Sequence, residues 1–190
     1  MRRCKNILTE KALKTLYYST FHSHLIYGIL IYSCAYQCNL NSLVIKQKKA
    51  IRCIMNAKYN AHTAHTGPLF LKQKILPFES LTLFFRLKFM FEYINNLMPR
   101  SFANIWQYRG ELNGNHMLRN NSEFNIPRFR ITLVEKLPLC SIPAAWNNYL
   151  DIDNVKNATS KKQFVVKLKK SLLNQIPLDC NRIGCPSCVR

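Results

Sequence analysis

Acidic residues are scarce in this sequence. Its 190 residues include nine Asp and Glu against 28 Lys and Arg, which gives a formal net charge of +19. No Asp or Glu occurs between Lys11 and Phe78, while nine Lys or Arg do. Two-metal phosphoryl transfer requires clustered carboxylates, so their scarcity predicts no such active site. A basic surface without internal acidic partners instead favours a phosphate polymer or an anionic membrane as binding partner.

Other catalytic signatures are missing as well. The sequence has no glycine-rich phosphate loop, no GxSxG and no HExxH motif. Asp151 and Asp153 are the only carboxylates that lie close together, and their setting, DIDNVKN, is typical of a helix-capping turn. We therefore expect no enzymatic activity and no cofactor for this chain alone.

A long hydrophobic run is also absent. No charged residue lies between Lys14 and Lys46, but the strongly apolar part is only Leu25–Tyr36, 12 residues. A helix that crosses a bilayer needs about 20. We therefore expect no membrane partner, and a small membrane protein with one span around Leu16–Tyr36 is the alternative hypothesis.

Eight cysteines are present, but no secretory signal accompanies them. The first residues, MRRCKNILTEKALK, are basic and lack an apolar core with a cleavage site. Cysteines without a secretory context are typical of reduced side chains rather than disulfides. We expect a cytoplasmic or nuclear location.

Two groups of metal-ligand residue types can be tested by spacing. His22 and His24 stand about 200° apart on a helix, so they cannot share a metal ion there. Cys180, Cys185 and Cys188 have the spacing C-x4-C-x2-C, and the C-x2-C half is a good zinc chelate. A structural zinc site has four ligands, so we expect this one to be incomplete; a zinc-binding adaptor is a second alternative.

Helical periodicity predicts a mainly α fold. The first helix should begin after an N-cap at Thr9, place His24 in the core as a hydrogen-bonded histidine, and end at Asn39 and Asn41. Its apolar stripe recurs at steps of mostly three or four residues: Leu13, Leu16, Tyr17, Thr20, His24, Tyr27 and Ile31. From Leu25 onward the other faces are apolar too, so the helix should become surrounded by core.

A second helix is expected over Ser42–Asn56, followed by a loop with the sequence AHTAHTGPLF. Its stripe consists of Leu43, Gln47, Ala50, Ile51 and Ile54. Lysines and an arginine occupy the remaining faces, so this is a basic amphipathic helix.

The rest of the chain predicts further helices and one short β element. Helices are expected over Phe78–Asn96 and about Ser160–Asn174, the latter with Phe164, Val165, Leu168 and Leu172 inward. Residues 100–125 should be irregular, 128–142 should form a small hairpin, and Pro143 and Trp146 should mark a turn. The expected divisions are 1–100 (helical), 101–127 (connection), 128–176 (small subdomain) and 177–190 (Cys-rich tail).

Five segments in order resemble one known family. They are LKTLYYSTFHSHLIYGILIYS, QKKAIRCIMNAKYNAHT, GPLF, KFMFEYINNLMP and IPAAWNNYL, which run from Leu13 to Leu150. Together they are similar to the C-terminal third of reverse transcriptases from non-LTR (LINE-type) retrotransposons, in particular the jockey-like group. AHTAHTGPLF departs from the family pattern, which usually has a single AHT followed by an acidic residue.

The resemblance implies a helical thumb and post-thumb region that cradles RNA template and growing DNA beside the polymerase palm. It also implies that Cys180, Cys185 and Cys188 begin a zinc knuckle, whose histidine and last cysteine are missing here. The paired aspartates that hold Mg²⁺ in the parent RNA-directed DNA polymerase do not occur in this sequence. The chain thus resembles a non-catalytic fragment, with RNA or RNA–DNA hybrid and the palm as its partners.

A thumb of this kind would grip a duplex through its backbone, which requires basic side chains rather than base-reading groups. The best candidates lie in and just after the second expected helix: Lys46, Lys48, Lys49, Arg52 and Lys58. A second set lies in the last expected helix: Lys167, Lys169 and Lys170.

Overall fold

The computed structural model describes residues 5–57, 65–112, 122–149, 155 and 158–177. The chain forms two compact units, unit 1 (Met1–Leu81 with Lys170–Arg190) and unit 2 (Thr82–Lys169). Both are mainly helical, as predicted. The boundaries between the units fall inside two helices, α6 (Phe78–Ile94) and α11 (Lys161–Asn174).

The first helix of unit 1 is broken into short pieces. α1 (Glu10–Leu16) begins at the predicted cap, where the Thr9 hydroxyl accepts the Ala12 N–H at 3.4 Å. A π-helical segment, η2 (Tyr17–His22), and α2 (Ser23–Ile26) follow, and after a break comes α3 (Ile29–Tyr32). The single long helix expected here is therefore wrong.

Gly28 explains the break between α2 and α3. Its φ of +65° lies in the left-handed region, which interrupts a right-handed helix and which glycine alone adopts without strain. The predicted stripe is exposed from Thr20 onward, before this break as well as after it. Tyr27 is 86% exposed and Ile31 74% exposed, and His24 is exposed rather than buried.

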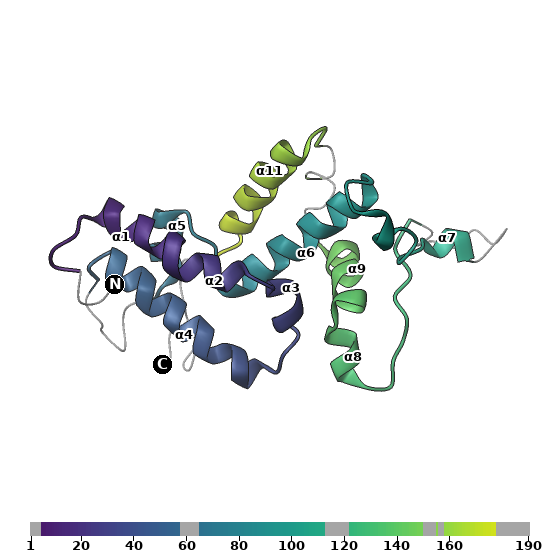
Figure 1. Cartoon of the computed structure of the whole chain (residues 1–190), viewed down its shortest axis with the longest axis horizontal. Coiled ribbons are helices and arrows are strands. Elements are labelled where there is room, and N and C mark those ends of the chain that lie inside the picture. The colour runs from purple at the N-terminus through teal and green to yellow at the C-terminus, as the bar shows by residue number, and fades with distance from the viewer. Residues whose placement is uncertain (1–4, 58–64, 113–121, 150–154, 156–157, 178–190) are drawn as a thin grey trace. The chain divides into compact units, whose positions relative to one another are not determined.

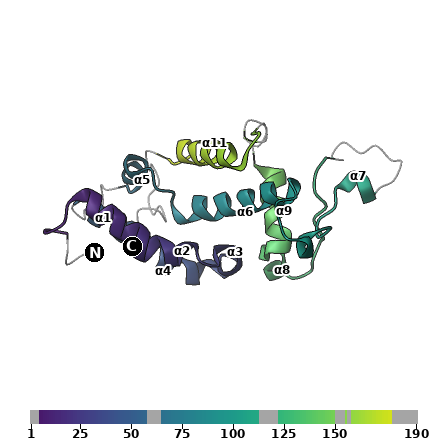
Figure 2. The same ribbon diagram turned by 45° about the horizontal axis from the view of Figure 1, so that its top comes forward.

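The main helix of unit 1 is α4 (Gln37–Ile54), which begins five residues earlier than predicted. Asn39 and Asn41 lie within it and do not end the preceding helix. The turn at Ser33–Tyr36 separates α3 from α4 instead. Figure 1 and Figure 2 show α4 running alongside α1 and α2, and α1 and α4 are in contact.

The segment expected as a loop after α4 is partly helical. Gly67–Gln73 forms α5, with Pro68 in its first turn, where proline costs no hydrogen bond. Residues 61–64 of that loop lie outside the described residues. α4 and α5 are in contact, and a common core joins them to α1 and to the chain after α11. Its buried members are Leu13, Tyr17, Ala50, Ile51, Ile54, Phe70, Ile75 and Ile176.

Unit 2 is built around α6 and the first part of α11. The prediction for both helices is confirmed, and Ser160 caps α11 by accepting the Gln163 N–H at 3.3 Å. Phe91 on α6 stacks on Phe164 of α11 with ring centroids 4.0 Å apart. At the start of α11, the Lys161 ammonium lies 2.9 Å from the Glu92 carboxylate.

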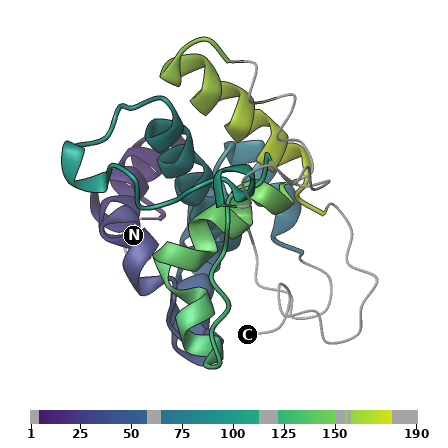
Figure 3. The same cartoon turned by 90° about the vertical axis from the view of Figure 1, so that its right-hand side faces the viewer.

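The hairpin expected over 128–142 is wrong. α8 (Thr132–Lys136) and α9 (Pro138–Asn148) occupy this stretch, and Figure 3 shows α8 leading into α9. Pro143 and Trp146 are buried inside α9 rather than in a turn. Because Pro143 has no N–H, the Leu139 carbonyl lacks its usual partner in the helix, and the indole N–H of Trp106 donates to it at 2.7 Å.

The described part of the connection between α6 and α8, residues 95–112 and 122–131, is largely irregular, as predicted. It contains a 3-10 turn, η3 (Arg100–Phe102), and a single helical turn, α7 (Arg109–Leu112). Among the described residues, its β structure is limited to one antiparallel bridge, between Tyr108 and Phe124. No helix in the described part of the chain is both long and apolar enough to span a membrane.

The Gly28→Ala substitution tests the role of the left-handed residue. Nothing lies within 4 Å of an added Cβ, so the cost comes from backbone conformation alone. We expect a loss of about 1 kcal/mol in the free energy of unfolding, measured by denaturant titration. Gly28→Asn should cost less, because asparagine tolerates this conformation; an alanine variant as stable as the wild type would contradict the assignment.

Candidate nucleic-acid interface

The helix α4 presents two faces of opposite character. One face is buried, as the sequence predicts, with residues at steps of three and four: Gln47, Ala50, Ile51 and Ile54. The fifth residue of that stripe, Leu43, is half-buried. The face opposite the core is therefore left to the basic residues.

The structure brings four of the predicted binding residues together on α4. Lys46 and Lys49 are exposed, and Lys48 and Arg52 are half-buried and have other contacts within the protein. At about 100° per residue, Lys48, Arg52 and Lys49 lie within one outward sector of about 100°, and Lys46 is about 60° further round. Within the described residues, neither Lys46 nor Lys49 has an ion-pair partner.

The charge of unit 1 as a whole supports the same surface. Its residues include 15 Lys and Arg but only three Asp and Glu. Lys11, Lys72 and Lys74 are exposed on α1 and at the end of α5. Unit 2 holds the other six acidic residues. Its ion pairs include Lys161 with Glu92, and Arg109 with Glu123 at 2.9 Å. The positive field of unit 1 is thus little compensated from within.

A buried amide fixes the rotation of α4 about its axis. The Gln47 side chain is 1% exposed, and its Nε2 donates to the Tyr17 hydroxyl at 3.1 Å and to the Leu76 carbonyl at 3.0 Å. Tyr17 lies on η2 and Leu76 precedes α6, so one amide joins three segments of unit 1. Burying this amide is tolerable because both of its N–H groups are satisfied.

A second polar contact joins α1 to the end of α5. The Lys14 ammonium donates to the Gln73 carbonyl at 2.8 Å, and the buried Gln73 amide donates to the Glu10 carboxylate at 2.6 Å. Lys14 therefore stabilises the fold, and its ammonium is not available to contact a ligand.

The second predicted set lies on α11. Lys167 and Lys170 are exposed, while Lys169 is half-buried and has other contacts. The boundary between the units falls between Lys169 and Lys170. These three residues therefore do not form a patch within either unit.

Some predicted site residues lie outside the described part of the chain. Lys58 is one, and Cys180, Cys185 and Cys188 are others. Among the described residues no group of three metal-ligand side chains comes together. The described cysteines form no disulfide: Cys34, Cys38, Cys53 and Cys140. Burial raises the pKa of the Cys140 thiol, and the negative charge of the nearby Glu135 adds a smaller effect in the same direction.

Sequence reasoning missed a group of aromatic residues in unit 2. Tyr93, Trp106, Tyr108 and Phe124 surround a hollow in a stretch expected only to be an irregular connection. The sequence signal was IWQY at 105–108, which is rich in aromatics for a loop. It did not predict a site because the partners come from separate segments.

Comparisons with protein-family models, with curated proteins and with solved structures gave no match to this chain.

The Gln47→Ala substitution tests how α4 is held. It leaves the Tyr17 hydroxyl and the Leu76 carbonyl buried without their partner, so we expect a loss of about 2–4 kcal/mol in the free energy of unfolding. Gln37→Ala is the control, because the Gln37 amide donates to Asn41 at 3.1 Å on the exposed side of the same helix. It should cost less than about 0.5 kcal/mol by denaturant titration; equal losses would contradict the special role of Gln47.

Tyr17 predicts a loss of stability at alkaline pH. Burial raises the pKa of its hydroxyl from 10.0 to about 12, against the lowering effect of the Gln47 hydrogen bond. The unfolded chain releases this proton near pH 10 and the folded protein near pH 12. The protonated Tyr17 hydroxyl therefore contributes fully to the free energy of unfolding below pH 10, and this contribution is lost as the pH rises through 12.

We expect the free energy of unfolding to fall relative to Tyr17→Phe by about 1.4 kcal/mol between pH 8 and pH 11. Denaturant titrations of both proteins across this range measure the difference, and the phenylalanine variant accounts for the titrating groups that are not coupled to Tyr17. A difference that does not change with pH would show that the hydroxyl ionises equally in both states.

Proposed function

We propose that this chain binds template–primer nucleic acid, RNA or RNA–DNA hybrid, through the phosphate backbone. In this proposal it is the non-catalytic thumb and post-thumb piece of a LINE-type RNA-directed DNA polymerase. The observation that carries it is α4, where an acid-free basic segment forms one helix with exposed lysines opposite a fixed, buried face. The ordered resemblance from Leu13 to Leu150 supports the same interpretation.

Phosphate binding suits the side chains that α4 offers. Lys46 and Lys49 are flexible point charges, and lysine contacts phosphate oxygens without reading sequence. Each phosphate that they neutralise releases condensed counterions, which gives affinity that falls steeply with salt. The proposed binding is therefore independent of sequence and electrostatic.

Catalysis would reside elsewhere in the parent polymerase. The paired aspartates that hold Mg²⁺ are not in this sequence, so the proposal gives the chain no chemical step. The palm of the parent protein is the proposed protein partner, and the proposed location is cytoplasmic or nuclear.

A salt series tests the phosphate contacts on α4. We expect the full chain to bind an RNA–DNA hybrid in filter-binding assays, with log K falling linearly as log salt rises. The double variant Lys46→Ala/Lys49→Ala should reduce the magnitude of this slope by about two, one unit per phosphate contact.

The matched control is Arg128→Ala/Arg130→Ala, which removes the same charge from exposed residues of unit 2. It should leave the slope nearly unchanged. If both pairs lower the slope equally, the binding follows net charge and not α4; if the wild type binds nothing at low salt, the proposed function is wrong.

A further inference from the structure

Three exposed lysines of unit 1 lie where α1 meets the end of α5. They are Lys11 on α1, Lys72 in the last turn of α5, and Lys74 directly after that helix. Within the described residues, none of the three has an ion-pair partner. The interface proposed on α4 does not include them.

One glutamine holds this junction together. Gln73 is buried, its carbonyl accepts the Lys14 ammonium at 2.8 Å, and its side-chain amide donates to the Glu10 carboxylate at 2.6 Å. Lys72 and Lys74 are its two neighbours in the chain. Because Gln73 is fixed through both its backbone and its side chain, the backbone of each neighbouring lysine is fixed at the surface as well.

Lys11 joins this group from α1. It stands three residues before Lys14, and residues three apart are neighbours on a helix surface, with Cβ atoms about 5–6 Å apart. Lys14 reaches the end of α5, so Lys11 lies beside that end too. Together the residues of the junction carry four ammonium groups and the one carboxylate of Glu10, which leaves an excess of positive charge there.

Lys74 occupies a position that does not suit a lysine. Its φ of +54° is left-handed, its N–H donates to the Leu71 carbonyl at 2.9 Å, and the Ile75 N–H donates to the Phe70 carbonyl at 3.0 Å. This is the Schellman motif, in which the left-handed residue is usually glycine because a Cβ is strained there. Phe70 and Ile75 are buried in the core of unit 1, so the core maintains this conformation.

Lys74 is also an exception within this chain. The other described non-glycine residues with a positive φ are all asparagines, which tolerate the conformation: Asn56, Asn96 and Asn104. Backbone conformation therefore gives no reason for a lysine at position 74. Strain of this kind is typical of ligand-binding sites, and here the property that the lysine adds is an exposed positive charge.

The junction lies next to the end of α4. The Gln73 amide also contacts the sulfur of Met55, the residue that ends α4. Met55 is about 60° from Arg52 around the helix axis, so the junction lies toward the Arg52 side of α4. Along the axis, Lys49 is six residues, or about 9 Å, before Met55. A strand with one phosphate about every 3.4 Å covers this distance in about three nucleotides.

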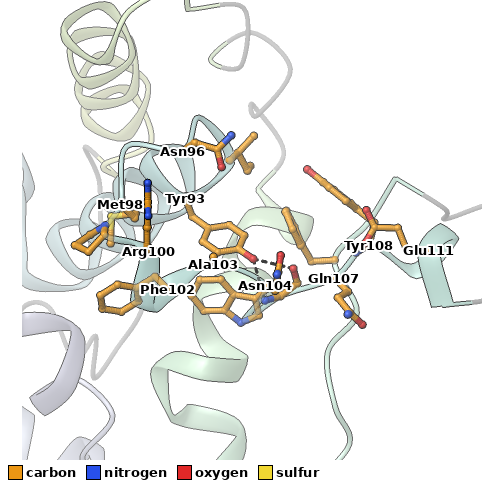
Figure 4. A pocket seen from close by; sticks show the side chains of 14 residues that line it. Tyr93, Asn96, Met98, Arg100, Phe102, Ala103, Asn104, Gln107, Tyr108 and Glu111 are labelled. Carbon is orange, nitrogen blue, oxygen red and sulfur yellow. Dashed lines mark hydrogen bonds between the residues drawn. The ribbon is translucent and has the colours of Figure 1, made fainter.

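The hollow in unit 2 is of another kind. Figure 4 shows Arg100 on one side of the Tyr93 ring and Glu111 on the other. Arg100 and Glu111 are the charged residues that line the hollow, and their charges cancel. A phosphate chain therefore finds no excess of positive charge there, whereas it does at the junction in unit 1.

We propose that Lys11, Lys72 and Lys74 form a second phosphate-binding surface, which contacts the backbone of the hybrid bound on α4 a few nucleotides further along the strand. This inference rests on the proposed function, because α4 defines where the strand lies. It extends that function, because none of the three residues belongs to α4. Lysine contacts phosphate oxygens without reading bases, so this surface is also independent of sequence.

The salt dependence of hybrid binding by the full chain tests this surface. In filter-binding assays with a hybrid of about 20 base pairs, Lys72→Ala/Lys74→Gly should reduce the magnitude of the slope of log K against log salt by about two. Adding Lys11→Ala should reduce it by about one more. The control Arg128→Ala/Arg130→Ala removes two charges from exposed residues of unit 2 and should leave the slope nearly unchanged.

Single substitutions of Lys74 separate its charge from its conformation. Lys74→Gly relieves the left-handed backbone, so the midpoint of thermal unfolding should rise by about 2–4 °C while the slope falls by about one. Lys74→Arg keeps the charge and should bind like the wild type. Asn56→Gly is the matched control, because it places glycine at an exposed, uncharged position of similar φ, and it should leave the slope unchanged.

The inference is overturned if Lys72→Ala/Lys74→Gly keeps the wild-type slope, or if Arg128→Ala/Arg130→Ala lowers the slope as much. It is also overturned if Lys74→Gly lowers both the unfolding midpoint and the slope, because Lys74 would then serve the fold. Lys46→Ala/Lys49→Ala, measured in parallel, separates the two surfaces. A slope that falls only in this α4 variant refutes the junction alone, and one that falls only in the junction variant refutes the α4 contacts alone. A wild type that binds no hybrid at low salt refutes both.

Discussion

Unit 1 depends on the burial of one amide. Gln47 is almost completely buried, so its two N–H groups need hydrogen-bond acceptors inside the protein. The acceptors are the Tyr17 hydroxyl and the Leu76 carbonyl. A rotation of α4 that broke these bonds would leave three polar groups unsatisfied. Apolar neighbours such as Ile51 would tolerate small rotations, whereas directional hydrogen bonds do not. The outward direction of Lys49 is therefore a consequence of the amide on the opposite face, and Lys46 lies at the side of the helix, about 100° from Gln47.

Unit 2 uses a proline for a comparable purpose. Pro143 removes one hydrogen bond from α9, and the carbonyl thus released accepts the indole N–H of Trp106. A residue that usually weakens a helix here supplies the acceptor that a buried tryptophan requires. Trp106 in turn is hydrogen-bonded to Tyr93 through its backbone, so the helix defect helps to hold two of the residues that line the hollow.

The sequence predicted those helices in which the spacing of the apolar residues matches the face that is buried. α6, α11 and the buried face of α4 have apolar residues at steps of three and four, and each was found as expected. It did not predict the break at Gly28, because a single glycine is compatible with a helix until tertiary packing selects a left-handed φ. The hairpin failed for a related reason. The apolar and polar residues of 128–142 alternate only loosely, and such a pattern does not distinguish a strand from two short helices. Pro138, which lies in the first turn of α9, was a signal for the start of a helix.

The two candidate sites differ in how far a sequence can predict them. The α4 lysines belong to one helix, so periodicity alone places them together, and only their exposure required a structure. The hollow combines α6, η3, α7 and Phe124, residues up to 31 positions apart in the chain, and no local pattern records that meeting. The character of the two also differs, since α4 presents exposed lysines whereas the hollow is lined largely by aromatic side chains.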